Sequence, residues 1–195
     1  MMRPVLLWDV MGTLVHDPFL LEMPEFFGMS FDAMLASKHP SAWVEFEVGR
    51  RTESEFLSDF FRDHRDFDHR GFIDAVRTAY RWLPGMEELL ADLRASGCTM
   101  HAFSNYPVWY ELVEQRLGLS RFLEWTFVSC RTGLRKPDPA AYRSVVEELG
   151  IPAEQLVFVD DRESNCEAAR QSGMGSVKFE GADSLRAYLA ETGVL

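Results

Sequence analysis

The sequence feature that most constrains the fold is an apolar run, Val5–Trp8, that ends in the carboxylate of Asp9 and turns at once through Gly12 and Thr13. A run of this length and composition predicts a strand that is buried on both faces. The turn leaves Asp9 at the carboxyl end of that strand. Because ligands of open parallel α/β sheets bind at that edge, Asp9 is a candidate functional residue.

Beyond residue 84, short apolar runs alternate with segments of helical spacing. The expected helices cover 86–95, 108–117, 139–149, 163–172 and a last segment from about 183. The expected strands cover 99–104, 125–129, 156–159 and a short run at 176–177. Such alternation indicates successive βαβ units. We therefore predict an α/β fold with a Rossmann-like, doubly wound parallel sheet.

Residues 17–83 lack strand-like β-branched runs and have helical spacing instead. Thr52–Glu55 has the capping-box pattern of a helix N-terminus. Ten of the fifteen phenylalanines fall in this stretch, so we expect it to have a small aromatic core of its own. Pro84-Gly85 then breaks the pattern and marks a hinge. These features predict an all-helical cap, residues 17–83, inserted into a core domain formed by residues 1–16 and 84–195.

Polar clusters follow four of the expected strands, directly or after a short loop. They are Asp9, Ser104-Asn105, Arg135-Lys136 and Asp160-Asp161. Because the carboxyl ends of parallel strands meet at one edge of a sheet, we expect these clusters to face one crevice. Adjacent carboxylates repel each other unless a cation lies between them, and hard oxygen ligands suit Mg²⁺. Either Asp160 or Asp161 could instead cap the helix expected from residue 163.

Four segments resemble the motifs of the haloacid dehalogenase-like (HAD) hydrolases. Val5–Val15 resembles the first motif, D-x-D-G-T, and Ser104-Asn105 resembles the second. Gly133–Pro139 resembles the third motif, G-x-x-K-P-x-P, and Phe158–Asn165 resembles the fourth in its D-D-x-x-x-N form. The chain as a whole resembles HAD hydrolases whose helical cap follows the first motif, over nearly all of its 195 residues.

The resemblance implies hydrolysis of a small phosphate monoester with Mg²⁺ as cofactor, through an aspartyl-phosphate on Asp9. Lys136 is implied to balance the charge of the crowded carboxylates and of the transferred group. The implied metal ligands are Asp9, the backbone carbonyl of Met11, Asp160 and Asp161. The implied phosphoryl-binding residues are Thr13, Ser104 and Asn105. Asp138-Pro139 also has the pattern of a helix N-cap and first turn, a purely structural role.

Several shorter segments resemble the flavin mononucleotide (FMN) hydrolases of plant plastids. They are Asp17–Phe19, Phe26–Met29, Lys38–Pro40, Asn105–Pro107 and Met174-Gly175. This resemblance alone implies FMN as a substrate. Aromatic residues of the expected cap, such as Trp43 and Phe46, could stack on the flavin ring, although most aromatic residues there are expected to form core.

Met11 departs from the HAD pattern, because it replaces the second Asp of the first motif. In HAD phosphatases that Asp protonates the leaving oxygen and then activates water, and a thioether can do neither. General acid–base catalysis is typically worth about 10²- to 10⁴-fold in rate. Asp17 and His16 are the nearest candidates to replace it. We favour Asp17 as the N-cap of the first cap helix with Pro18 at N1, and His16 as a solvated loop residue.

Three alternatives to a phosphatase stay open. A 2-haloacid dehalogenase needs no protonated leaving group, but that branch has Tyr at the position of Met11 and lacks the paired metal carboxylates. A phosphonate-cleaving relative needs a cap lysine, and Lys38 is the only lysine between residues 17 and 83. A HAD-fold protein with little catalytic activity would not explain why Asp9, Lys136 and the acidic pair are all present.

Composition excludes some partners. A formal net charge of −11 argues against binding to nucleic acid or to an anionic membrane surface. Three scattered cysteines indicate a reducing compartment, and no apolar run approaches the length that spans a bilayer. Met1–Pro4 leads straight into the first expected strand, so we expect no targeting peptide and a cytoplasmic location.

Overall fold

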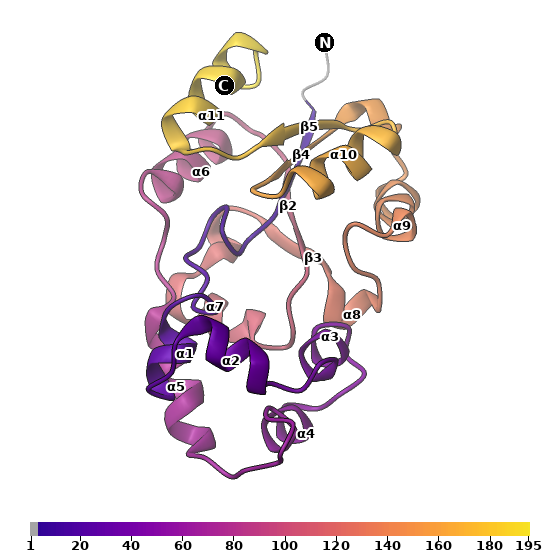
Figure 1. Ribbon diagram of the computed structural model, residues 1–195. Coiled ribbons are helices and arrows are strands. Elements are labelled where there is room, and N and C mark those ends of the chain that lie inside the picture. The colour runs from indigo at the N-terminus through magenta and orange to yellow at the C-terminus, as the bar shows by residue number, and fades with distance from the viewer. Residues whose placement is uncertain (1–3) are drawn as a thin grey trace.

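The computed structural model of the chain describes residues 4–195 and contains one five-stranded parallel sheet (Figure 1). The expectation for the leading segment, Met1–Arg3, lies outside the described residues. The strands are β1 (Val5–Trp8), β2 (Met100–Ser104), β3 (Glu124–Val128), β4 (Leu156–Asp160) and β5 (Gly175–Lys178). Their order across the sheet is β3-β2-β1-β4-β5. The predicted α/β fold with a doubly wound parallel sheet is confirmed.

The helices that connect the strands begin and end within two residues of the predicted bounds. They are α6 (Met86–Ala95), α7 (Tyr110–Leu117), α9 (Pro139–Leu149), α10 (Glu163–Gln171) and α11 (Ala182–Glu191). The sequence patterns missed α8 (Ser129–Thr132) and two short 3₁₀ helices, η1 (Leu119–Arg121) and η2 (Ala153–Gln155). Asp138 is the N-cap of α9, as predicted, and its carboxylate accepts a bond from the backbone N–H of Ala140 at 2.8 Å.

The side chains of β1 alternate between two buried faces of the sheet. Leu6 and Trp8 pack in the same cluster as the apolar residues of α6 and α11, whereas Leu7 packs with those of α9 and α10. All three side chains are fully buried. A strand with helices against both faces has no polar side, which explains why the run that precedes Asp9 is continuously apolar.

The central position of β1 sets where a ligand can bind. Trp8 pairs with Ala102 of β2 on one side and with Val159 of β4 on the other. Asp9 therefore follows β1 at the level where β2 and β4 also end. The chain crosses over in opposite directions on the two sides of β1, and such a switch point opens a crevice at the carboxyl ends of the strands.

Helices of residues 17–83 gather at this carboxyl edge, below the sheet in Figure 1. They are α1 (Glu22–Phe26), α2 (Phe31–Ser37), α3 (Ala42–Glu47), α4 (Glu53–Ser58) and α5 (His69–Ala79). Thr52 forms the predicted capping box with Glu55 at the start of α4. We treat these helices as the cap.

The aromatic cluster of the cap includes a residue from outside residues 17–83, contrary to the expectation of a separate cap core. Trp109, which directly precedes α7, lies edge-on to Phe46 and Phe56 with ring centroids 5.3 and 5.5 Å apart. Its indole N–H donates to the carboxylate of Glu53 at 2.5 Å. Trp109 is only 1% exposed, so it belongs to the same core as the cap rings. One continuous apolar cluster therefore joins the cap helices to the sheet.

Two expectations for the segment after β1 are wrong. Helix α1 begins at Glu22 with Leu21 as N-cap, so Asp17 does not cap it. The Asp17 carboxylate instead accepts a bond from the backbone N–H of Phe19 at 3.0 Å, because an Asp-Pro pair also favours a tight turn. His16 is not a free loop residue, since its Nε2 donates to both carboxylate oxygens of Glu22 at 2.8 and 2.9 Å.

Candidate active site

Three carboxylates and one ammonium group meet at the carboxyl edge of the sheet. Carboxylate oxygens of Asp9, Asp160 and Asp161 all lie within 4.8 Å of one another. Lys136 enters from the loop before α9, and its Nζ donates to Asp9 Oδ1 and to Asp160 Oδ2, both at 2.7 Å. The tips of β1 and β4 are thus joined by a lysine that is 2% exposed. The sequence predicted that these four residues would meet.

The two adjacent carboxylates have different surroundings. Both oxygens of Asp160 are occupied, because they accept bonds from Lys136 Nζ, from the backbone N–H of Arg162 at 2.8 Å and from Asn165 Nδ2 at 3.0 Å. The Asp161 side chain accepts no hydrogen bond from another residue within 4–195 and is the most accessible of the three carboxylates. Asp161 therefore has free oxygens for a ligand, and Asp160 does not.

Neither acidic residue is the N-cap of α10. The N-cap is Arg162, whose side chain makes no capping bond, so the predicted capping alternative is wrong as stated. Asp160 still takes up the backbone N–H of this N-cap residue. Its other side-chain bonds are to Lys136, which lies outside α10, and to Asn165, which lies in the first turn of α10.

Thr13 and Asn105 connect the segments that carry the charged residues of the cluster. The Thr13 hydroxyl donates to Asp9 Oδ2 at 3.2 Å and accepts a bond from the backbone N–H of Asp161 at 3.1 Å. Asn105 exchanges two 2.8 Å bonds with the backbone of Lys136, donating to its carbonyl and accepting from its N–H. These bonds fix the tips of β1 and β4 and the lysine loop relative to one another.

Ser104 ends β2 beside this network. Its hydroxyl is buried and has no partner in the described part of the chain. Buried hydroxyls are nearly always hydrogen-bonded, so an orphaned one beside a site is explained when a ligand oxygen supplies the partner.

The charges of the cluster do not balance. Three carboxylates against one ammonium leave a formal charge of −2 on the directly contacting groups. Burial raises the pKa of Asp9 to about 7, Lys136 opposes the rise, and Asp160 adds to it. Burial disfavours the charge on Lys136, but the two carboxylates outweigh this effect and raise its pKa. A divalent cation would offset the excess charge, and an all-oxygen donor set suits Mg²⁺.

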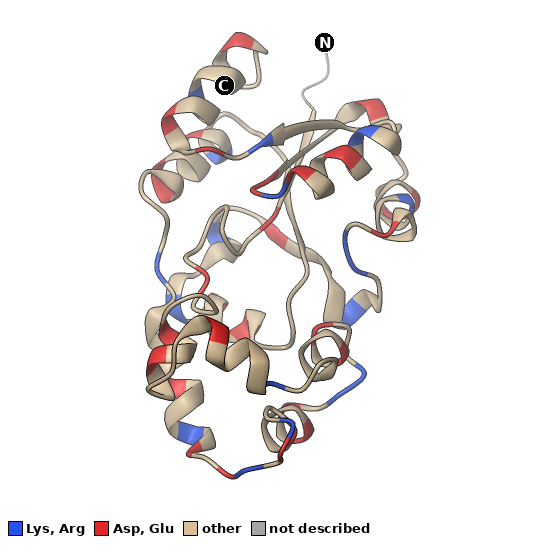
Figure 2. Ribbon diagram, viewed as in Figure 1, with Lys and Arg blue, Asp and Glu red and all other residues tan. Residues whose placement is uncertain are grey.

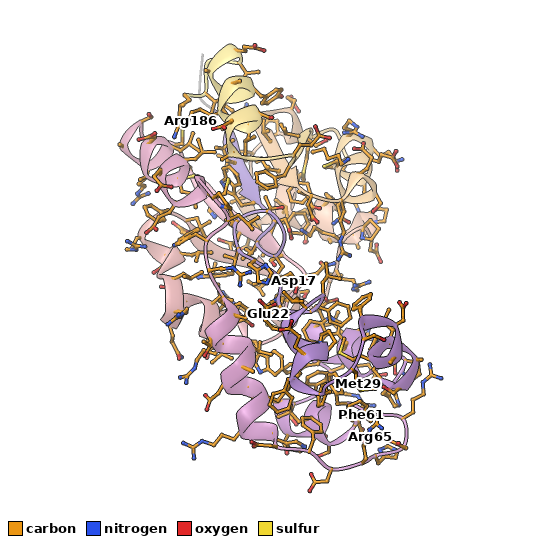
Figure 3. The ribbon with its side chains drawn as sticks, turned by 60° about the vertical axis from the view of Figure 1, so that its left-hand side comes forward. Asp17, Glu22, Met29, Phe61, Arg65 and Arg186 are labelled. Carbon is orange, nitrogen blue, oxygen red and sulfur yellow. The ribbon has the colours of Figure 1, made fainter. Side chains whose placement is uncertain are left out.

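A cavity of about 210 Å³ adjoins the cluster and is lined by residues of both the sheet edge and the cap. Its floor includes Asp9, Met11 and Lys136, and its walls carry the aromatic residues Phe19, Trp43 and Tyr106. Asp17 also lines it, and Figure 3 shows Asp17 at mid-height, between the cap helices and the sheet.

An ion pair closes one side of this cavity. Arg135 Nε donates to Glu47 Oε2 at 2.9 Å, and Arg135 Nη2 lies 2.8 Å from the same oxygen as an ion-pair contact. Trp43 Nε1 donates to Glu47 Oε1 at 3.0 Å. Glu47 ends α3, so this pair ties the cap to the loop that carries Lys136. The Ser129 hydroxyl also donates to the backbone carbonyl of Glu47 at 2.5 Å.

The structure brings most of the candidate residues to the cavity but not all of them. Asp9, Met11, Asn105, Lys136 and Asp161 line it. Thr13, Ser104 and Asp160 are buried beside it and are not among its lining residues. Lys38, which the phosphonate-cleaving alternative requires, does not line it either.

The sequence analysis assigned no site role to two lining residues, Glu47 and Asn165, and it favoured a capping role over the candidate acid role of a third, Asp17. Asn165 was available from the D-D-x-x-x-N pattern, where it is the last position. Glu47 follows Trp43 by four residues, so the two share one helix face. A carboxylate beside aromatic residues on that face was the available signal.

Basic and acidic residues are interspersed over both the cap and the sheet, as Figure 2 shows. The sequence as a whole has a formal net charge of −11. No helix in the part of the chain that the structure covers has the length and hydropathy to cross a membrane.

Sequence comparisons agree with one another. A family model described as haloacid dehalogenase-like hydrolase matches residues 4–173. Flavin mononucleotide hydrolase 1 of Arabidopsis thaliana, named as a chloroplast protein, is 48% identical over 191 residues, which are 98% of this chain and 78% of that protein. A phosphoglycolate phosphatase of Pseudomonas savastanoi pv. phaseolicola is 36% identical over 97 residues, 48% of this chain and 35% of that protein.

Solved structures share the fold. A HAD family enzyme of Bacteroides thetaiotaomicron has a TM-score of 0.77 and 20% identity, covering 96% of this chain and 99% of that chain. The same enzyme in complex with magnesium and inorganic phosphate has a TM-score of 0.71 and 20% identity, covering 91% and 94%. A dehalogenase structure has a TM-score of 0.68 and 19% identity, covering 91% and 85%.

Replacing Lys136 tests whether the ammonium group stabilises the cluster. We expect Lys136→Met to lower the free energy of unfolding by roughly 3–5 kcal/mol, because it leaves buried carboxylates without their counter-charge. Carboxyl groups whose pKa is raised by folding bind protons more tightly in the folded state, so the deficit relative to wild type should shrink between pH 8 and pH 5.

Urea unfolding at both pH values measures this deficit. Lys178→Met is the matched control, because Lys178 is exposed and its contact with Glu180 is 3.6 Å long. The control should change stability by less than about 0.5 kcal/mol. Equal effects of the two substitutions would contradict the role given to Lys136.

Proposed function

The chain belongs to the haloacid dehalogenase-like hydrolases, and from that premise we propose that it is a Mg²⁺-dependent phosphate-monoester hydrolase that acts on FMN. The observation that supports this most is the buried cluster of Asp9, Lys136 and the acidic pair beneath a cavity. The cluster combines a candidate nucleophile, a fixed cation and an excess of negative charge that fits a divalent metal.

Asp9 is the proposed nucleophile. Its Oδ2 receives one bond, from Thr13 at 3.2 Å, and its Oδ1 is held by Lys136. Attack on the phosphorus atom would form a P–O bond to Asp9 and break the bond to the ester oxygen, which leaves with the electron pair. Water would then attack the same phosphorus atom, release phosphate and return the electron pair to the Asp9 carboxylate.

The residues that would hold Mg²⁺ are Asp9, Asp161 and the backbone carbonyl of Met11. Asp161 is favoured over Asp160 as a direct ligand because no other described residue donates to its oxygens, whereas Lys136 and Asn165 occupy those of Asp160. Asp160 would then orient Lys136 from behind. The metal would neutralise charge on the phosphoryl oxygens during transfer.

Ser104 and Asn105 are proposed to contact the phosphoryl group. The Ser104 hydroxyl lacks a protein partner, which is the condition expected of a donor kept for a ligand. Asn105 lines the cavity, but its amide already bonds to the backbone of Lys136. Its larger contribution, and that of Thr13, would be to position Lys136 and Asp9.

FMN as substrate is supported by the similarity to the Arabidopsis enzyme and by the cavity walls. Phe19 and Trp43 are stacked at a centroid distance of 6.2 Å and both line the cavity. Phe46 is unavailable to a ligand, since it is 2% exposed and stacked on Phe56. Aromatic walls suit a flat ring system.

The proposed cap, residues 17–83, would have to move to admit FMN. A cavity of about 210 Å³ is smaller than the roughly 300–1,000 Å³ that is usual for ligands of that size. The Glu47–Arg135 pair would break and re-form as the cap opens and closes over the phosphate. A reducing compartment such as the cytoplasm remains the proposed location, which the three unpaired cysteines favour.

Activity on FMN and on 4-nitrophenyl phosphate tests the proposal. We expect Mg²⁺-dependent phosphate release from both esters and none after chelation by EDTA. Asp9→Asn should lower kcat by roughly 10³- to 10⁶-fold, because it removes a covalent nucleophile. Asp183→Asn, on the exposed first turn of α11, should have no effect.

Other outcomes point to other functions. Chloride release from 2-haloacids without metal would indicate a dehalogenase. Tight binding of phosphate esters without turnover would indicate a protein with the fold but little catalytic activity.

Asp161→Asn tests the metal ligand assigned above. Loss of a residue that hydrogen-bonds to a metal ligand typically weakens metal binding by roughly 10- to 100-fold. We expect loss of the ligand itself to raise the Mg²⁺ concentration for half-maximal activity by at least that factor. Glu163→Gln is the control, because this carboxylate lies two residues away and pairs with Arg170. An unchanged Mg²⁺ dependence in Asp161→Asn would exclude Asp161 as a ligand.

Trp43→Ala tests the aromatic wall. We expect KM for FMN to rise by about 2- to 10-fold, which corresponds to the energy of one ring–ring contact. KM for β-glycerophosphate, an ester without a ring, should change much less and serves as the reference. A parallel change for both esters would show that Trp43 acts only through Glu47 and the cap.

A further inference from the structure

The cavity contains more carboxylates than the proposed nucleophile and metal site require. Asp9, Asp17, Glu47 and Asp161 line it. Two of them, Asp17 and Glu47, have no assigned role in transfer. Meanwhile Met11 cannot supply the proton that an alkoxide leaving group needs, so one of the two spare carboxyl groups is a candidate donor.

Glu47 is unsuited to donate a proton. Arg135 Nε donates to its Oε2, the Arg135 guanidinium forms an ion pair with the same oxygen, and Trp43 donates to its Oε1. Burial raises the pKa of Glu47, and Arg135 opposes the rise. A proton on either oxygen would compete with a donor already bound there, so these contacts favour the anion.

Asp17 has the opposite environment. Its Oδ1 accepts one bond, from the backbone N–H of Phe19, and its side chain has no other hydrogen bond within residues 4–195. That bond fixes the carboxyl group at the cavity wall while leaving Oδ2 open. Asp17 lines the same cavity as Asp9, and Figure 3 shows it between the cap helices and the sheet.

The groups that act on Asp17 come from its own loop and from other segments of the chain. Arg162 at the start of α10 and His16 stabilise its negative charge, and Glu22 of α1 opposes it. The hydroxyls of Tyr80 and Tyr106, which bond to each other at 2.8 Å, lie close enough to feel the charge of Asp17. Burial is the largest effect and raises the pKa of Asp17 above its ordinary value. A carboxyl group that keeps its proton nearer to neutral pH is suited to general acid catalysis.

We propose that Asp17 is the general acid and base of this enzyme, in place of the carboxylate that Met11 replaces. The proposal rests on the proposed phosphatase function. In the first step the Asp17 carboxyl group gives its proton to the ester oxygen as the P–O bond breaks, so the product leaves as an alcohol. In the second step the Asp17 carboxylate takes a proton from the attacking water, which restores the acid as phosphate leaves Asp9.

Asp17→Asn isolates this role. The amide keeps an oxygen that can accept the bond from Phe19, so the turn is preserved. We expect kcat/KM for β-glycerophosphate, whose leaving group is a strongly basic alkoxide, to fall by about 10²- to 10⁴-fold. For 4-nitrophenyl phosphate, whose leaving group needs little protonation, kcat/KM should fall by less than about 10-fold, because it reports only the steps up to formation of the aspartyl-phosphate.

Two further readouts separate catalysis from structure. Slow hydrolysis of the intermediate in Asp17→Asn should produce a burst of about one nitrophenolate per enzyme. Wild-type kcat/KM for β-glycerophosphate should decline toward alkaline pH as Asp17 loses its proton, and this decline should be absent from Asp17→Asn. Asp17→Glu keeps the carboxyl group and should restore part of the lost rate.

Glu47→Gln is the matched control, since it removes the other spare carboxylate of the same cavity. It should slow both esters by a similar factor and give no burst. An equal loss for both esters in Asp17→Asn, without a burst, would overturn the assignment of Asp17 and leave the phosphatase intact. Absence of Mg²⁺-dependent turnover in the wild type would overturn both, and the same assays distinguish these results.

Discussion

The contact on which the rest of the site depends is the pair of 2.7 Å bonds from Lys136 Nζ to Asp9 and Asp160. Burying an ammonium group costs several kcal/mol, and that cost is offset only when carboxylates surround it closely. Here the two carboxylates end β1 and β4, so the electrostatics of the site also fix the sheet edge. Asn105 completes the arrangement, because its amide holds the backbone of the lysine loop against the end of β2.

The same contacts make the two neighbouring acidic residues unequal. The oxygens of Asp160 accept bonds from Lys136, from Asn165 and from the backbone N–H of the residue that caps α10. The oxygens of Asp161 accept no bond from another described residue. Three carboxylates against one lysine leave an excess of negative charge. Burial raises the pKa of Asp9, and the nearby charge of Asp160 adds to the rise. This arrangement supports the proposed Mg²⁺ site on the Asp161 side of the cluster.

The cap contributes the other half of the cavity and is bound to the sheet by two kinds of contact. Trp109 inserts into the aromatic cluster of the cap helices, which gives the interface its apolar part. The Glu47–Arg135 pair supplies a polar contact at the rim of the cavity. Because this pair occupies Glu47, Asp17 is the one of these two carboxyl groups that has an open oxygen and no ion-pair partner among the described residues.

The sequence by itself determined the strands, most helices of the α/β part and the meeting of Asp9, Lys136 and the acidic pair. Those features follow from hydrophobic periodicity and from the rule that parallel strands end at one edge, which are properties of local sequence. Only the tertiary structure decided that Trp109 joins the cap core, that Asp17 faces the cavity instead of capping α1, and that Asp160 and Asp161 differ. Each of these depends on which donors or rings a side chain meets, and the partners come from segments that are distant in the chain or fixed only once the cap has docked.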